Sequence, residues 1–350
     1  MTPKSSYLGV ALVAWLTIAL PVIAEPTPTP LPEGQIKAHR IASDVFNPGW
    51  DWSRFPGATV TRLSLDKAEL LVMALNRNAK SNPANSGLKA QKSFHCFNDI
   101  IVCLGSSISH PNSKDPVETL LFQQHLKKAD HPIGINGKDV SALPYDKTFT
   151  SPTLLCDVVG NYYHIPGKQD LRISRQSSHT NSHQARAWLD HGTQTKNASY
   201  HYSVLVSPNK ERVEAWKNSR GYTLLRHDSG AHIVAAGNTT SYALFKAGKA
   251  EAVPQEGKPN PAVIKVSAPC LIITKLEENT LKLYLTGSDL RTPSEEDEIF
   301  NSKGNGPIIV TLNGPYTLQS GIGVAATTVD GKTTLNFNTD RGRTLRCVLK

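Results

Sequence analysis

The segment PGWDWSRFPGAT, residues 48–59, combines side chains that could bind a sugar. Trp50 and Trp52 carry indole faces suited to stacking on pyranose rings, and Arg54 carries a guanidinium suited to a carboxylate or sulfate. Two Pro-Gly pairs place sharp turns beside them. Two interpretations stay open. The tryptophans are buried at the start of a strand while Arg54 reaches water, or all three side chains line the rim of a carbohydrate-binding cleft.

Other polar residues offer further candidates. Arg175, in ISRQ, is either a charge at a sheet edge or a contact to an anionic sugar. His191, in AWLDH, fits a hydrogen-bonded core histidine better than a catalytic base. His179 and His183 have the spacing of a helical metal site, but their loop is polar and lacks a helical pattern. We therefore expect no catalytic metal and no required cofactor, although a structural divalent cation such as calcium stays compatible with the sequence.

The five cysteines are an odd number, so at least one thiol cannot pair within a monomer. Cys96 and Cys103 flank a predicted turn at Asn98-Asp99, and this register makes them diagonal neighbours, beyond comfortable disulfide geometry. All five are surrounded by apolar residues in the sequence. We expect buried free thiols.

The N-terminus has the pattern of an export signal. Residues 1–24 carry one charge, Lys4, followed by an apolar run that ends at Ala24, which predicts a secretory signal peptide cut after that residue. Pro21 interrupts the run and no charged flank follows, so a stable membrane span is disfavoured. Residues 25–47 begin with EPTPTPLPEG, a proline-rich linker. We expect a secreted or periplasmic protein.

The charge balance restricts the partners. The chain has 38 Lys and Arg against 29 Asp and Glu, a formal net charge of +9. A basic exported protein suits anionic partners. The basic residues are scattered rather than gathered in a dense block, which disfavours nucleic acid. An acidic polysaccharide is the favoured partner.

The elements that must position these residues are mostly strands. Alternation in ASYHYSVLV puts Tyr200, Tyr202, Val204 and Val206 on one face of a strand. Hairpin turns are predicted at residues 228–230, 278–279 and 330–331, the last with an Asp-Gly pair typical of a tight primed turn.

One short helix is predicted near residues 208–219, with Ser207 as its cap, Pro208 at its first position, and Val213 and Trp216 on its buried stripe. The fold class is therefore all-β.

We predict two domains after the linker. A large antiparallel β-sandwich covers residues 48–255, and a smaller C-terminal β domain covers residues 256–350. The break is placed in the polar, proline- and glycine-rich residues 248–261.

An ordered series of motifs then becomes recognisable. The sequence SFHCFNDIIVCLGSSISHPNSKDPVETLLFQQHL, together with WDWSR, resembles the C-terminal sandwich region of chondroitin sulfate ABC lyases in polysaccharide lyase family 8. The resemblance continues through GINGK, LPY, ISRQ, AWLDH and ASYHY and ends near SDLRT, so it covers about 240 residues in the family's order.

The resemblance implies a reaction and one catalytic residue. The family cleaves chondroitin sulfate, dermatan sulfate or hyaluronan by β-elimination at a uronic acid. Its histidine, tyrosine and arginine come from an α/α toroid, and one glutamate comes from the sandwich, at the position of Glu118 in VETLLFQ. That glutamate orients its partners and does not abstract the proton. Trp50, Trp52 and Arg54 would lie at the junction with the toroid.

The sequence departs from the family pattern in two places. The toroid would lie upstream of Trp50, where only the signal, the linker and a short segment stand, so we expect Glu118 without the residues it should orient. Residues 63–87, LSLDKAELLVMALNRNAKSNPANSG, stand where family members usually have additional β-sheet. This segment is shorter, and its sequence looks partly helical.

Three hypotheses follow. The chain is the sandwich portion of a secreted glycosaminoglycan lyase, inactive until a separate α/α-toroid chain is supplied. Alternatively, it is a non-catalytic module that binds acidic polysaccharide, or it is a structural remnant.

Overall fold

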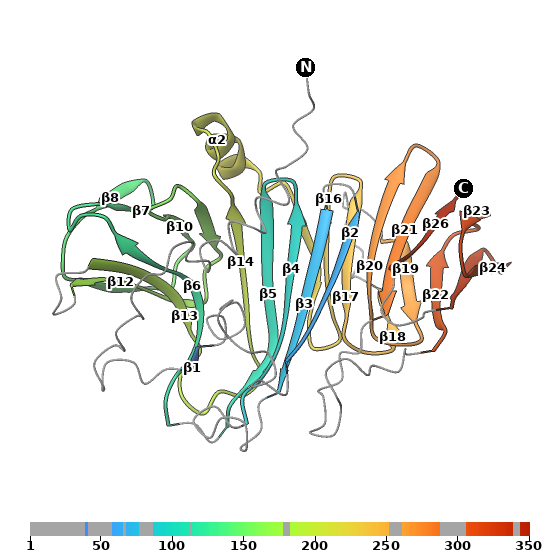
Figure 1. Ribbon diagram of the computed structural model, residues 1–350, viewed down its shortest axis with the longest axis horizontal. Coiled ribbons are helices and arrows are strands. Elements are labelled where there is room, and N and C mark those ends of the chain that lie inside the picture. Colours follow the sequence, from blue (N-terminus) through green and yellow to red (C-terminus); the bar gives the residue numbers. More distant parts are fainter. Residues whose placement is uncertain are drawn as a thin grey trace, which may run out of the picture.

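The computed structural model describes most of the chain after residue 57 (Figure 1). The described residues are 39–40, 58–65, 68–76, 87–111, 114–177, 183–251, 261–287, 306–338 and 344–350. The predicted signal peptide and nearly all of the predicted linker lie outside these ranges. Within them, no helix is both long enough and apolar enough to span a bilayer.

Four sheets build the fold, and the first two come mainly from the N-terminal half. Sheet A has the order β1 (His39–Arg40), β6 (Val117–Leu126), β13 (His183–Asp190), β12 (Asp170–Ser177) and β9 (Tyr145–Phe149). Sheet B has the order β2 (Ala58–Leu65), β3 (Ala68–Asn76), β4 (Lys89–Phe97), β5 (Ile100–Ser109), β14 (Ala198–Leu205), β11 (Tyr162–Ile165), β10 (Thr153–Cys156), β7 (Ile133–Ile135) and β8 (Lys138–Val140).

The other two sheets come from residues after 222. Sheet C has the order β15 (Thr223–His227), β16 (Ala231–Ala236), β17 (Thr239–Leu244), β20 (Cys270–Glu277), β21 (Thr280–Gly287), β26 (Thr344–Leu349) and β23 (Leu318–Gly321). Sheet D has the order β18 (Gly248–Lys249), β19 (Val263–Val266), β22 (Ile308–Asn313), β25 (Lys332–Phe337) and β24 (Val324–Val329). Among the named pairs in the described ranges, β1 with β6 is parallel and the rest are antiparallel.

The sheets stack as successive layers, A to D from left to right in Figure 1. Three hydrophobic cores separate them, one between A and B, one between B and C, and one between C and D. Strand β5 shows why sheet B can serve two cores. Ile101 and Cys103 belong to the A/B core, whereas Val102 and Leu104 belong to the B/C core. Alternating side chains of one strand point to opposite faces, so a continuous apolar run suits a central layer.

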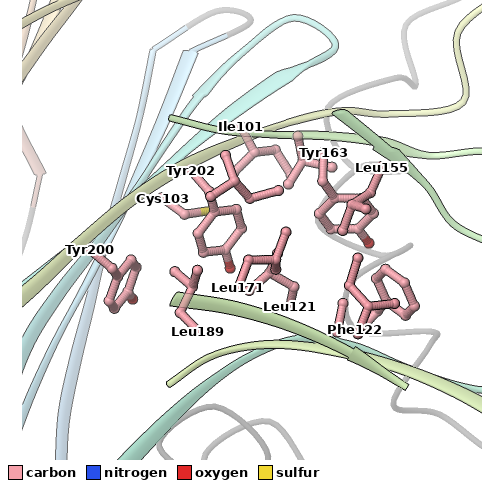
Figure 2. Close-up of a cluster of buried hydrophobic side chains, with 14 of the residues drawn as sticks. Ile101, Cys103, Leu121, Phe122, Leu155, Tyr163, Leu171, Leu189, Tyr200 and Tyr202 are labelled. Atoms are coloured by element: carbon pink, nitrogen blue, oxygen red, sulfur yellow. The ribbon is translucent and has the colours of Figure 1, made fainter. Parts of the chain in front are cut away.

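The A/B core joins aliphatic and aromatic side chains. Figure 2 shows Leu121 and Leu189 of sheet A pointing toward Tyr163 and Tyr202 of sheet B. The predicted face of β14 is confirmed, because Tyr200, Tyr202 and Val204 are all in this core.

The predicted hairpin turns are confirmed. Residues 228–230 join β15 to β16, residues 278–279 join β20 to β21, and residues 330–331 join β24 to β25. Asp330 and Gly331 have φ of 51° and 70°, the positive values that a tight primed turn requires.

The cysteine prediction is also confirmed. All five thiols are free, and all but the half-buried Cys156 are buried. Cys96 pairs with Ile101 and Cys103 pairs with Phe94 across the β4–β5 hairpin, so the two cysteines are not opposite each other.

The partly helical expectation for residues 63–87 is wrong for residues 63–65 and 68–76, which lie in β2 and β3, while residues 66–67 and 77–86 lie outside the described ranges. Strand β3 pairs with β2 over residues 68–75 and with β4 over residues 68–76. Its sequence, AELLVMALN, is rich in helix formers, but two flanking strands supply its backbone hydrogen bonds, and tertiary context overrides weak intrinsic propensity.

The predicted helix exists as α2 (Lys210–Asn218), with Val213 and Trp216 buried as expected. Its cap is Asn209 and not Ser207, because the Asn209 side chain accepts a hydrogen bond from Arg212 N at 2.8 Å. In the described part of the chain α2 is the one α-helix.

The predicted boundary near residue 255 does not separate two sheets. Strand β17 pairs with β20, for example Thr239 with Lys275, so sheet C contains strands from both sides of that boundary. Strand β18 lies within the Pro/Gly-rich residues 248–261 and pairs with β19 of the same sheet D. A Pro/Gly-rich composition alone therefore does not identify a linker between domains.

Candidate active site on sheet A

Glu118 lies on the outer face of sheet A. It is the second residue of β6, and its neighbour Val117 belongs to the A/B core, so the Glu118 side chain points the other way. Its Cα partners are Arg40 of β1 and Asp190 of β13. Glu118 is nevertheless only 4% exposed.

One partner of Glu118 is Arg186 of β13. Ala185 and Ala187 are in the A/B core, so Arg186 shares the outer face with Glu118. Arg186 Nη2 donates a hydrogen bond to Glu118 Oε2. The Arg186 guanidinium lies 4.0 Å from the centroid of the Trp188 ring. The arginine side chain thus extends along β13 across the indole to reach the carboxylate.

A second arginine completes this group. Arg172 of β12 lies 5.2 Å from the Trp188 ring centroid and forms ion pairs with Asp146 (3.6 Å) and Asp190 (3.7 Å). We call these side chains the sheet A polar cluster, which consists of Glu118, Arg186, Trp188, Arg172, Asp146 and Asp190. A guanidinium over an indole is stabilised by the ring quadrupole as well as by its carboxylate.

The geometry decides what Glu118 can do chemically. A carboxylate that is buried and hydrogen-bonded to a guanidinium is an acceptor that fixes the direction of that cation. A general base must instead reach the proton that it removes. The arrangement therefore suits Glu118 to holding Arg186 in a fixed direction rather than to removing a proton.

His191 is hydrogen-bonded, as predicted, but half-buried rather than part of the core. Its Nε2 lies 2.8 Å from Thr119 Oγ1, and its ring stacks on Tyr200 with centroids 6.1 Å apart. Burial, with a smaller contribution from the Lys92 charge, lowers the pKa of His191 to about 4. At neutral pH the ring is uncharged, so it is not available as an acid.

The Arg175 guanidinium is enclosed by loop backbone. Its side chain is fully buried, and its guanidinium donates to three backbone carbonyls, those of Ala142 (2.7 Å), Ala129 (2.9 Å) and His131 (2.8 Å). It ties two loops to β12. A surface charge was expected because arginine is rarely buried, but unpaired loop carbonyls supply the acceptors that make burial tolerable.

The remaining predicted residues lie outside the described ranges. These are Trp50, Trp52, Arg54 and His179. His183 is described, and its Nδ1 lies 2.9 Å from Ser177 Oγ. Among the described residues, no three His, Cys, Asp or Glu side chains are grouped as metal ligands.

Sequence reasoning missed Arg186 and Trp188. The signal was present in QARAWLD, residues 184–190, where alanines and a leucine alternate with polar or aromatic residues. Period-two alternation places Arg186, Trp188 and Asp190 on one face. Alternation does not show that this strand pairs with the strand of Glu118, because that pairing forms only in the tertiary structure.

A buried histidine network lies in the B/C core. Ser93 Oγ lies 2.8 Å from His95 Nε2 and 2.7 Å from His232 Nδ1. The chain continues from His95 to Ser241 (2.6 Å) and from His232 to Ser106 (2.9 Å). Burial is the main cause that lowers the pKa of His95 to about 3 and the pKa of His232 well below its usual range. This network connects sheets B and C and is closed to solvent.

Comparison with known sequences decides the family. The sequence profile of the polysaccharide lyase family 8 super-sandwich domain matches residues 43–217, which is half of the chain. The chain belongs to polysaccharide lyase family 8.

Curated relatives of this family 8 chain include two exolyases. A chondroitin sulfate ABC exolyase of Proteus vulgaris is 25% identical over 77% of this chain and 30% of its own length. A chondroitin sulfate ABC exolyase of Bacteroides thetaiotaomicron is 27% identical over 77% of this chain and 31% of its own length. The family 8 chain thus spans about a third of the length of the curated relatives that it matches.

Solved structures show the same fold. Xanthan lyase of Paenibacillus superimposes with a TM-score of 0.66 at 19% identity, over 84% of this chain and 28% of its own. Streptomyces coelicolor A3 chondroitin AC lyase gives a TM-score of 0.55 at 18% identity, over 88% and 41% of the two chains.

Proposed function

We propose that this chain supplies the β-sandwich part of a lyase that cleaves glycosaminoglycan by β-elimination at a uronic acid. Family membership and the activities for which its relatives are named support a substrate of the chondroitin sulfate, dermatan sulfate or hyaluronan class. The observation that carries the proposal is the Glu118–Arg186 pair on the outer face of sheet A. It places the matched glutamate beside a cation in a fixed direction.

The chemistry explains why such a pair is useful. The proton at uronate C5 is weakly acidic, so the uronate carboxylate must be neutralised before a base removes that proton and an acid protonates the leaving 4-oxygen. In the family the base, the acid and an arginine come from an α/α toroid. Glu118 orients cationic and hydroxyl partners at the face where that toroid docks. No cofactor is required for these steps.

We place the protein outside the cytoplasm, in a secreted or periplasmic state. The apolar residues before Ala24 support this. Sequencing the N-terminus of exported protein should find Glu25 first. A mature protein that retains Lys4 contradicts export by signal cleavage.

Reconstitution tests the function. The chain alone and the chain mixed with a family 8 toroid chain are incubated with chondroitin sulfate, and the absorbance of the unsaturated uronate is followed. We expect no product from the chain alone and product from the mixture. Glu118→Gln should reduce turnover in the mixture, whereas Glu214→Gln, the same change in an exposed ion pair of α2, should not. Product from the pure chain, or full activity of folded Glu118→Gln, contradicts the proposal.

One observation favours a second candidate, a non-catalytic module for acidic polysaccharide. Glu118 is already hydrogen-bonded inside the chain, and the chain as a whole is basic. Binding of chondroitin sulfate without any product, even when a toroid chain is present, distinguishes this candidate from the lyase.

A further inference from the structure

A pocket of about 510 Å³ opens where sheets B and C meet α2. It lies at the end of the molecule that carries α2 and the β4–β5 turn (Figure 1). The polar side chains that line it come from two turns, from α2, from β17 and from β20, and they are Asn98, Asp99, Arg212, Asn238, Thr239 and Lys275. Its volume lies within the range of sites that hold small molecules, roughly 300–1,000 Å³.

Arg212 gives the pocket its chemical character. Its Nε donates to Asp99 Oδ2 at 2.6 Å and its Nη2 donates to Asp99 Oδ1 at 2.8 Å. Asp99 thereby holds one edge of the guanidinium in place. In the described structure Nη1 makes no hydrogen bond, and the Arg212 side chain is 33% exposed. The second edge of a guanidinium fork matches the two oxygens of a carboxylate or sulfate.

The rest of the lining suits a sugar ring. Phe97 and Ile100 also line the pocket, are nearly fully buried, and provide an apolar floor for the C–H face of a ring. Asn238 Nδ2 donates to Leu276 O at 2.8 Å, which fixes the amide beside the pocket. Lys275 adds a second cation, and it shares the carboxylate of Glu277 with Lys282. A few oriented polar groups around an apolar base are the usual composition of a saccharide or small-ligand site.

We propose that this pocket binds an anionic sugar of one or two rings, with its carboxylate or sulfate on the open edge of Arg212. The inference rests on the proposed function for its substrate class. It concerns a site separate from the sheet A polar cluster, because the whole of sheet B and the A/B core lie between the pocket and Glu118.

Calorimetric titration of the full chain tests the proposal. The probes are an unsulfated glucuronate-containing disaccharide, a sulfated chondroitin disaccharide, and neutral cellobiose. We expect binding of at least one anionic probe and none of cellobiose. Binding of the unsulfated probe identifies the carboxylate as the ligand group, and binding of the sulfated probe alone identifies the sulfate. Equal binding of cellobiose overturns the proposal.

Two variants locate the site. Arg212→Gln should weaken binding by about tenfold or more, the size expected for loss of one charge-assisted hydrogen bond. Ala236→Leu fills part of the pocket with a larger apolar side chain without changing the charge of the pocket, and it should abolish binding. The second variant decides the result if the first lowers the melting temperature. Unchanged affinity in a folded Ala236→Leu protein overturns the proposal.

Two control variants distinguish binding in the pocket from binding elsewhere on the protein. Arg226 donates the same two hydrogen bonds, from Nε and Nη2, to Asp228, but at the opposite end of β16 from the pocket, so Arg226→Gln should leave binding unchanged. Glu118→Gln should also leave it unchanged. If Glu118→Gln abolishes binding while Arg212→Gln does not, the sugar lies on sheet A and the pocket proposal is wrong. If the pocket binds but the reconstituted mixture gives no product, the proposed lyase function fails and the pocket proposal stands.

Discussion

Arg186 lies across the ring of Trp188 to reach Glu118, and these three side chains come from two neighbouring strands of sheet A. The Cα partner of Glu118 is Asp190, so the arginine bridges four positions along β13 to make this contact. Both charged side chains are at most 10% exposed. This relationship changes the expected consequence of altering Glu118, because a buried charge that loses its partner destabilises the fold.

We predict that Glu118→Gln lowers the free energy of unfolding by about 3 kcal/mol, the order expected when one member of a buried ion pair is removed. Urea unfolding of the wild type, Glu118→Gln, Arg186→Met and the double variant measures the coupling between the two residues. Glu214→Gln is the matched control for an exposed pair. Additive effects of the two single changes contradict a coupled pair.

We predict loss of stability in mild acid because of the histidine network. The pKa of His95 is lowered to about 3 in the folded protein, mainly by burial, whereas an unfolded histidine titrates near 6.5. The unfolded chain therefore binds a proton that the folded chain excludes. The neutral network stabilises the fold fully above about pH 6.5, and stability falls by about 1.4 kcal/mol per pH unit for such a histidine as pH decreases toward the folded pKa.

His95→Gln tests this prediction, since an amide keeps hydrogen-bonding capacity but does not titrate. Between about pH 6 and pH 4, the slope of unfolding free energy against pH should decrease by the amount that one bound proton contributes, about 1.4 kcal/mol per pH unit. His125→Gln, at an exposed position of β6, is the control. Identical slopes for wild type and His95→Gln count against the network as the source of acid sensitivity.

We predict that Gly105→Ala destabilises the protein by about 1–3 kcal/mol, the usual cost of overpacking a core. A Cβ at Gly105 would lie 2.1 Å from Tyr200 Cε1, and the Tyr200 ring is buried beside it. Thermal melting measures the effect. In a Tyr200→Ala background the same glycine change should cost much less, and an equal cost in both backgrounds shows that the ring is not the obstacle.

We predict weak binding to sulfated polysaccharide that decreases as salt rises. The chain carries a formal net charge of +9, and charges at a protein surface are screened beyond roughly 8 Å at physiological ionic strength. Retention on a heparin or chondroitin sulfate matrix, measured at increasing sodium chloride, checks this. Retention that is independent of salt rules out an electrostatic origin.

The hairpins and the buried strand face were readable from the sequence because their determinants are local. An Asp-Gly pair at residues 330–331 favours positive φ by itself, and the alternation around Tyr200 and Tyr202 sets one buried face without knowledge of the partner strand. The same holds for Val213 and Trp216, whose spacing on α2 follows helical periodicity.

The sequence by itself determined the all-β class, the family resemblance and Glu118 as the residue to examine. Only the tertiary structure decided that β3 is a strand, that Arg175 is enclosed by loop carbonyls, and that Glu118 is paired with Arg186. The physical reason is the range of the interactions. Turn and alternation signals arise from neighbours in the chain, whereas the partner of a buried charge, 68 residues away for Glu118, exists only after the strands have paired.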